Sequence, residues 1–120
     1  MSQKSVQAEE LFDKDAFFSR LLGDEELARE VIGVFLADVP NKINALTQVL
    51  NRRDAPKVRD HAHSIKGAAL NVSAVALSAV ALEMEKAGES SDIDHAVSLM
   101  PNIDRQFELF KNELVLAGLV

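Results

Sequence analysis

The sequence contains no cysteine, tryptophan or tyrosine, and its aromatic content is six phenylalanines among 120 residues. The absence of cysteine excludes disulfide bonds and thiolate metal sites. A core of aliphatic side chains with few bulky rings favours packed helices over a β-sandwich. No apolar run approaches the roughly 20 residues that a membrane-spanning helix needs. The N-terminal stretch also lacks the apolar segment of a signal peptide, so we expect a cytoplasmic protein.

The sequence contains few glycines and fewer basic than acidic residues. The five glycines are scattered and form no glycine-rich loop for ATP phosphates, so we expect no kinase activity and no ATP site. The formal net charge is −6. Nucleic acids and anionic membranes both favour a basic surface, so neither is an expected partner. What remains is an acidic globular chain, 48% hydrophobic, long enough for one core.

Apolar residues recur at helical spacing along most of the chain, and no useful strand-like alternation is present. Residues 1–9 show no periodicity and are expected to be a flexible lead-in to one domain over 10–120. The spacing predicts a short helix over 11–23, closed by Gly23, and four long helices after it. The expected fold is therefore all-α: an antiparallel four-helix bundle with a short extra N-terminal helix.

The boundaries of the long helices rest on local signals. Each is preceded by a polar residue suited to N-capping, and the four are Asp24, Asp54, Ser73 and Asp92. Gly88 is expected to end the third long helix. Pro40 and Pro101 fall inside the first and the last as expected kinks. The predicted apolar stripe of the first long helix comprises Leu27, Val31, Val34, Phe35 and Val39.

The stretch RDHAHSIKGAALNVSA, residues 59–74, presents its two histidines differently. The core-facing stripe of this helix is predicted to be Val58, Ala62, Ile65, Ala69 and Val72. On a helical wheel, His63 lies about 140° from the centre of that stripe and points to solvent. His61 lies only about 60° off it, so we expect a half-buried, structural histidine. His95, near the start of the last helix, is expected to be a surface residue.

The residues around His63 suggest chemistry. Lys66 is three positions on, so its ammonium can reach the space above the ring. Gly67 is four positions on, where a mid-helix glycine costs about 1 kcal/mol relative to alanine but leaves space beside the imidazole. Leu70 adds an exposed apolar spot. An exposed imidazole with an adjacent cation and a cleared approach suits a nucleophile that accepts an anionic group from a docked partner.

A carboxylate on the next helix is a candidate partner for the ring. Antiparallel pairing places His63 opposite residues 82–85, where Glu83 and Glu85 are the polar choices. A carboxylate that accepts the Nδ1 proton would leave Nε2 unprotonated and nucleophilic. The spacing leaves Glu83, Glu85 and no ring contact open. A metal site is not expected, because His61 and His63 do not share a helix face.

The segment AHSIKGAALNVSA, residues 62–74, resembles the motif of histidine phosphotransfer (Hpt) domains, the carriers of multistep two-component phosphorelays. The resemblance extends to helix order and length and covers essentially residues 10–117. Leu70 and Ser73 depart from it, since the family often has glycine at both positions. The matching motif positions are Ala62, His63, Ile65, Lys66, Gly67, Ala68 and Ala69.

The resemblance implies a role for each site residue. It implies that His63 is the phosphoacceptor, reacting through Nε2, and that Lys66 is the cation near the phosphoryl group. Gly67 would give a receiver domain's active site room to approach. Glu85 falls where many members carry a glutamine or glutamate that holds the histidine ring.

The resemblance also implies the partners. These are response-regulator receiver domains, which would dock near Ser64 and Leu70, and a hybrid sensor histidine kinase is a further candidate. The phosphoryl group would come from a receiver aspartate and pass to a second receiver. The protein would be a stoichiometric intermediate without a cofactor of its own, because the metal ion belongs to the receiver. A monomer is expected; the direction of flow and the presence of a larger parent kinase stay open.

A different class of function is also compatible with the pattern. The bundle could be a non-catalytic helical adaptor that binds a partner protein, with His63 incidental. Gly67 separates the two, since an adaptor would tolerate a larger residue there and a phosphoryl carrier would lose transfer rate.

Overall fold

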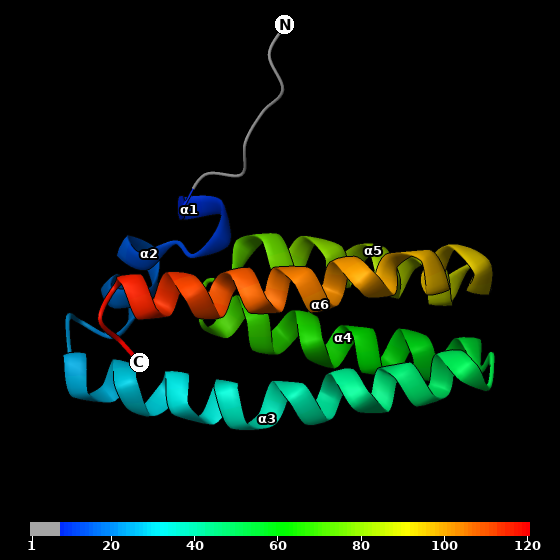
Figure 1. The fold of residues 1–120 in the computed structure, drawn as a ribbon, viewed down its shortest axis with the longest axis horizontal. Coiled ribbons are helices and arrows are strands. Elements are labelled where there is room, and N and C mark those ends of the chain that lie inside the picture. The colour runs from blue at the N-terminus through cyan, green and yellow to red at the C-terminus, as the bar shows by residue number, and fades with distance from the viewer. Residues whose placement is uncertain (1–7) are drawn as a thin grey trace, which may run out of the picture.

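The computed structural model describes residues 8–120, with side chains from Glu10 onward, and this part of the chain is helical without strands. Two short helices, α1 (Ala8–Leu11) and α2 (Lys14–Arg20), come first. The long helices are α3 (Glu25–Asn51), α4 (Ala55–Asn71), α5 (Val75–Glu89) and α6 (Ile93–Leu116). These four lie side by side in alternating directions (Figure 1). The predicted all-α four-helix bundle is confirmed.

The N-terminal part differs from the single helix predicted over 11–23. Phe12 leaves helical geometry and is buried, with its ring 5.4 Å from that of Phe110. Asp13 then starts α2 by accepting the Ala16 N–H at 3.1 Å, because a short carboxylate competes with the helical backbone. The predicted short helix is therefore present as α2, but it begins at Lys14 and ends at Arg20, and α1 precedes it as a separate turn of helix. The predicted lead-in falls outside the described residues up to residue 7, and α1 already begins at Ala8.

Three of the four predicted N-caps are in place. The carboxylates of Asp24, Asp54 and Asp92 each accept the backbone N–H three residues on, at 3.0, 3.3 and 3.2 Å. The prediction for Ser73 is wrong, because it is a left-handed turn residue with φ 57° and Ala74 occupies the cap position. The Ser73 hydroxyl instead accepts from Arg20 Nη2 at 2.9 Å. This contact ties α2 to the turn that follows α4.

Small residues let α4 and α5 pack closely. Ala62 and Ala69 of α4 and Ala81 of α5 are fully buried. Gly88 does not end α5 as predicted but lies buried inside it, where a Cβ would come within 2.6 Å of the Arg59 backbone nitrogen. The missing side chain lets the two backbones approach. This proximity brings α5 side chains within hydrogen-bonding distance of α4.

The α3 helix is continuous through Pro40, as α6 is through Pro101. The buried stripe of α3 is shifted relative to the predicted one, because it includes Ala28 and Ile32. Phe35 and Val39 are buried, whereas Val34 is 68% and Leu27 is 40% exposed. Each residue advances about 100° around a helix, so Val34, next to Phe35, falls off the core-facing side. The predicted stripe is wrong at these two positions.

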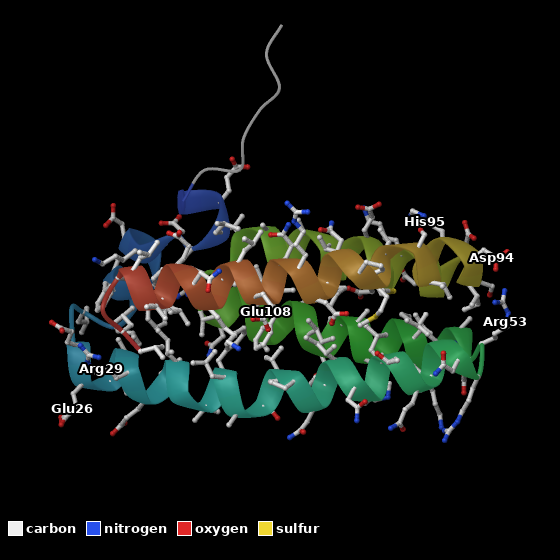
Figure 2. All side chains as sticks on the ribbon, in the orientation of Figure 1. Glu26, Arg29, Arg53, Asp94, His95 and Glu108 are labelled. Atoms are coloured by element: carbon white, nitrogen blue, oxygen red, sulfur yellow. The ribbon has the colours of Figure 1, made fainter. Side chains whose placement is uncertain are left out.

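Charged side chains cover the outside of the bundle (Figure 2). At one end, Arg53 in the α3–α4 turn forms a 2.8 Å ion pair with Asp94 at the start of α6. Both side chains are more than half exposed, so the pair contributes little to stability. Over the described residues, the helices are too short or too polar to cross a bilayer.

Candidate functional site

His63 projects from the middle of α4 into solvent. Its neighbours Ala62 and Ile65 are fully buried in the core, and they fix the rotation of the helix. The His63 side chain is 66% exposed. His61 is half-buried on the same helix. The two histidines therefore lie as the helical wheel predicts.

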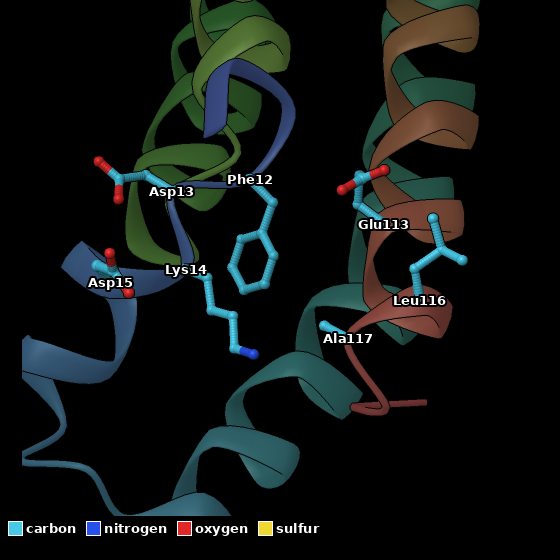
Figure 3. Close-up of a pocket in the computed structure, with 7 residues that line it drawn as sticks. All are labelled: Phe12, Asp13, Lys14, Asp15, Glu113, Leu116 and Ala117. Carbon is cyan, nitrogen blue, oxygen red and sulfur yellow. The ribbon is translucent and has the colours of Figure 1, made fainter. Parts of the chain in front are cut away.

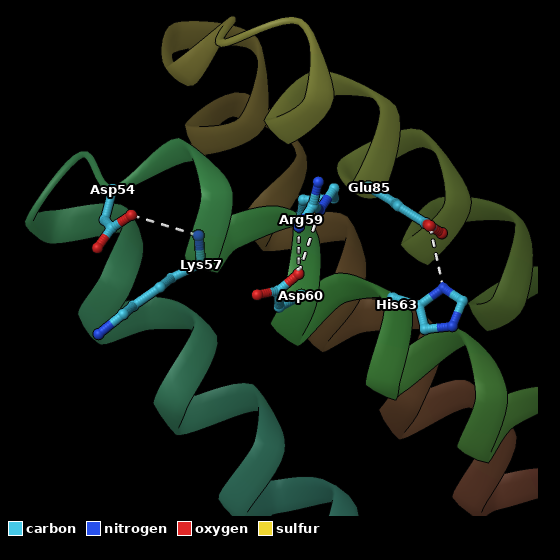
Figure 4. Close-up of polar contacts among 6 residues, drawn as sticks. All are labelled: Asp54, Lys57, Arg59, Asp60, His63 and Glu85. Atoms are coloured by element: carbon cyan, nitrogen blue, oxygen red, sulfur yellow. Dashed lines mark hydrogen bonds and ion pairs between the residues drawn. The ribbon is translucent and has the colours of Figure 1, made fainter.

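Glu85 of α5 contacts the imidazole of His63. Its Oε2 lies 3.0 Å from Nδ1, and Figure 4 shows the carboxylate beside the ring. Glu83 points to another helix, where its Oε2 lies 3.4 Å from Nε2 of the exposed His95. Of the alternatives left open by the sequence, the ring contact is thus with Glu85. An ionised carboxylate only accepts hydrogen bonds, so this contact favours a proton on Nδ1 and a free lone pair on Nε2.

Lys66 shares the same carboxylate. Its Nζ lies 2.8 Å from Oε1 of Glu85, so the ammonium is paired across the helix interface and not held above the imidazole. The Lys66 contact lowers the pKa of the Glu85 carboxyl below its ordinary value of 4.5, partial burial opposes this, and His63 adds to the lowering. Glu85 is therefore ionised at neutral pH and links the two site residues of α4.

The surface beside His63 is open. Apart from Gly67, its two chain neighbours and the backbone of its own helix, no atom of the described residues lies within 4 Å of the position that a Cβ on Gly67 would take. Leu70, one turn further, is 53% exposed. An open surface therefore continues from the imidazole along α4.

Ser64 is less accessible than His63. It is half-buried, and its hydroxyl accepts a hydrogen bond of 2.7 Å from Nζ of Lys42 on α3. Lys42 also lies 3.5 Å from Asp38 one turn before it. No sequence pattern predicts the Lys42–Ser64 contact, because it depends on the register between α3 and α4.

A groove between α3 and α4 adjoins this surface. It has a volume of about 270 Å³. Its lining residues are Val31, Val34, Phe35, Asp38, Ala68 and Asn71. The sequence prediction missed it because it placed Val34 in the core. The groove can accept an apolar side chain of a docked protein.

A second concavity, of about 300 Å³, lies where α6 ends beside the α1–α2 junction (Figure 3). It is lined by Phe12, Asp13, Lys14, Asp15, Glu113, Leu116 and Ala117. None of these residues belongs to α4 or α5, so it is separate from His63. Across residues that the structure describes, no three histidine, aspartate or glutamate side chains cluster as metal ligands.

Comparisons with known proteins agree with this geometry. A family model described as "Hpt domain" matches residues 30–114, which include every site residue described above. The crystal structure of histidine-containing phosphotransfer protein B (HptB) from Pseudomonas aeruginosa PAO1 is similar, with a TM-score of 0.78 and 27% sequence identity. That match covers 86% of this chain and 93% of the HptB chain. No curated protein matches the sequence.

Proposed function

The chain belongs to the Hpt domain family, and from that premise we propose that His63 is the residue that carries the phosphoryl group. A histidine phosphotransfer role in phosphorelay signalling follows from the family and from the likeness to HptB. The observation that carries the choice of residue is the exposed imidazole whose Nδ1 contacts a carboxylate at 3.0 Å. Neither His61 nor His95 combines exposure with an open surface and a free Nε2.

The transfer requires no proton to leave the ring. The Nε2 lone pair attacks the phosphorus of an aspartyl phosphate on a receiver domain, in line with the bond that breaks. The electrons of that P–O bond return to the receiver's carboxylate. The proton on Nδ1 stays in place, held by Glu85. Donation to a second receiver is the same step in reverse, with a new carboxylate as the nucleophile.

Lys66 and the receiver's metal ion offset the charge of the transition state. In the structure the Lys66 ammonium is paired with Glu85, 2.8 Å away. Lysine has a flexible four-carbon stem, so the ammonium can turn toward phosphoryl oxygens on the neighbouring imidazole. Lys66 is therefore paired with Glu85 before transfer and contacts the phosphoryl group during it.

The receiver docks over α3 and α4. Gly67 leaves its active site room to reach Nε2, and Leu70 with the α3–α4 groove supplies apolar contact. The family works with receiver domains. The proposal adds three points: the particular receivers, a hybrid sensor kinase as phosphoryl source, and the absence of an ATP site. The binding is weak, because a carrier must release each partner.

The test is transfer from a phosphorylated receiver, followed by mass spectrometry. The wild-type protein gains one phosphate that is labile in acid and stable in alkali. His63→Gln abolishes the gain, while His61→Gln and His95→Gln, as matched controls, retain it. Uptake by the His63→Gln variant would move the acceptor to another histidine. A wild-type protein that binds the receiver and takes up no phosphate would instead be an adaptor.

A further inference from the structure

Glu85 contacts two groups and carries a full negative charge, whereas orienting the imidazole requires only a hydrogen-bond acceptor. Its two carboxylate oxygens contact two cation-forming groups, Nδ1 of His63 at 3.0 Å and Nζ of Lys66 at 2.8 Å. The carbonyl of a glutamine side chain would accept the Nδ1 hydrogen bond equally well. A carboxylate adds a full negative charge, in a side chain that is only 15% exposed and so weakly screened.

We propose that the negative charge of Glu85 keeps Nδ1 protonated while Nε2 carries the phosphoryl group, and thereby makes the phosphohistidine a ready donor across neutral pH. This inference rests on the proposed function of His63 and concerns the regulation of that same site. Glu85 is then a positioning residue that acts through the imidazole, and its charge sets how the donor responds to pH.

The chemistry of the leaving group gives the reason. With Nε2 phosphorylated and Nδ1 protonated, the ring carries a positive charge. When a receiver carboxylate attacks phosphorus, the P–N bond breaks and its electron pair returns to Nε2, so neutral imidazole leaves. Without the Nδ1 proton, an imidazolate anion would have to leave, which is much less favourable. An opposite charge beside Nδ1 stabilises the protonated ring and extends the reactive form to higher pH.

Lys66 works against Glu85 in this balance. Its ammonium stays close to the imidazole, whether it pairs with the Glu85 carboxylate or turns toward the phosphoryl oxygens, and in both positions it repels the protonated ring. Removing Lys66 and removing the charge of Glu85 must therefore move the protonation of the ring in opposite directions. Three other charged groups around this pair already have partners. Arg59 of α4 is attracted by Asp60, Glu89 and Glu85, and Lys42 of α3 contacts Asp38 and Ser64. Glu83 of α5 pairs with His95 of α6.

The test needs no receiver. Protein labelled with ¹⁵N is phosphorylated with phosphoramidate, and the ¹⁵N chemical shift of Nδ1 in phosphorylated His63 is followed against pH. The half-life of the phosphohistidine is measured over the same range. In Glu85→Gln, the pH midpoint at which Nδ1 loses its proton falls by about one unit, and the fall in lability with rising pH shifts with it.

Two further variants make the test two-sided. Glu83→Gln removes the same charge two residues away on the same helix and leaves the midpoint unchanged. Lys66→Gln raises the midpoint, and it carries the test alone if Glu85→Gln does not fold.

An equal midpoint in wild type and Glu85→Gln overturns the inference, as does a midpoint in Lys66→Gln that is unchanged or lower. Either result leaves the proposed function intact, provided that His63 takes up phosphate. Absence of phosphate on His63 in the wild-type protein overturns the proposed function itself.

Discussion

Gly67 leaves open space beside His63, which the proposed transfer from a docked receiver would need. A glycine in the middle of a helix weakens it by about 1 kcal/mol relative to alanine. The surroundings give no packing reason for it, since no described atom beyond its chain neighbours and its own helix backbone lies within 4 Å of the missing Cβ. The same open surroundings are found at Gly33 on α3. Matched substitutions at the two glycines can therefore separate an effect on the approach of a receiver to His63 from an effect on the free energy of unfolding.

Gly67→Leu should stabilise the fold by up to about 1 kcal/mol and still slow phosphoryl transfer from a receiver at least about tenfold. The added side chain favours the helix but blocks the approach to Nε2 by a protein. Phosphoramidate is small, so its rate of phosphorylation should change little. Gly33→Leu serves as the control, with the same gain in unfolding free energy and normal transfer. A Gly67→Leu variant with wild-type transfer would refute the steric role.

Glu85 should also make stability depend on acid pH. Its pKa is lowered below 4.5 in the folded protein, chiefly by Lys66. The contribution of its ionised form is therefore complete above that pH and is lost as pH falls through the lowered pKa. Urea unfolding of wild type and Glu85→Gln should differ most at pH 7 and least in strong acid. A difference that grows toward acid would contradict this sign.

From the sequence, the side of the helix that a residue faces was easier to predict than the side chain that it contacts on another helix. The stripe that includes Ala62 and Ile65 sufficed to place His63 outside, because it lies on the same helix. The choice between Glu83 and Glu85 needed the register between α4 and α5 to within half a turn. The Lys66–Glu85 pair needed the same register, so the sequence alone left Lys66 above the ring.

At the scale of the helices, the approach of α4 to α5 decides the site. Gly88→Ala should destabilise the protein by about 1–3 kcal/mol, because a Cβ 2.6 Å from the Arg59 nitrogen forces the two backbones apart. It should also weaken the His63–Glu85 contact one turn away. Chemical denaturation measures the first effect and the NMR signals of the imidazole the second. Gly33→Ala, at an open helical position, should instead be stabilising. Equal stability of Gly88→Ala and wild type would refute the close approach.

The helix ends show why boundaries were harder to predict than helices. Glycine is the usual sign of a left-handed residue after a helix. Within residues 8–120, four non-glycine residues adopt that conformation: Leu22, Arg53, Ser73 and Ser91, with φ of 55–58°. The glycine near the end of α5, Gly88, serves helix packing instead. Both predictions at these ends, Ser73 as a cap and Gly88 as a stop, were therefore wrong for the same reason.

At the scale of the whole molecule, the features of a carrier gather on one side of the bundle. His63, Gly67 and Leu70 lie along α4, and the α3–α4 groove adjoins them. The sequence sufficed for the fold class, because apolar periodicity and chain length restrict the architectures. It did not reveal the groove, which depends on how two helices diverge at the surface.

Leu70→Lys should weaken binding of a receiver about tenfold, which corresponds to about 1.4 kcal/mol. A charge would replace the exposed apolar side chain at the expected contact. Phosphorylation by phosphoramidate should be unaffected, since it needs no docking. Val115→Lys on α6 is a matched control, because Val115 is 58% exposed compared with 53% for Leu70. Equal receiver affinity of the two variants, measured by calorimetry, would move the docking surface elsewhere.

The proposed carrier function depends most on a single bond, between phosphorus and Nε2 of His63. It is observed directly as ³¹P–¹⁵N coupling in ¹⁵N-labelled protein that a phosphorylated receiver has charged. We expect the coupling to Nε2 of His63, with the proton of the ring on Nδ1 beside Glu85. Coupling to Nδ1 of that ring, or to a nitrogen of His61 or His95, would contradict it.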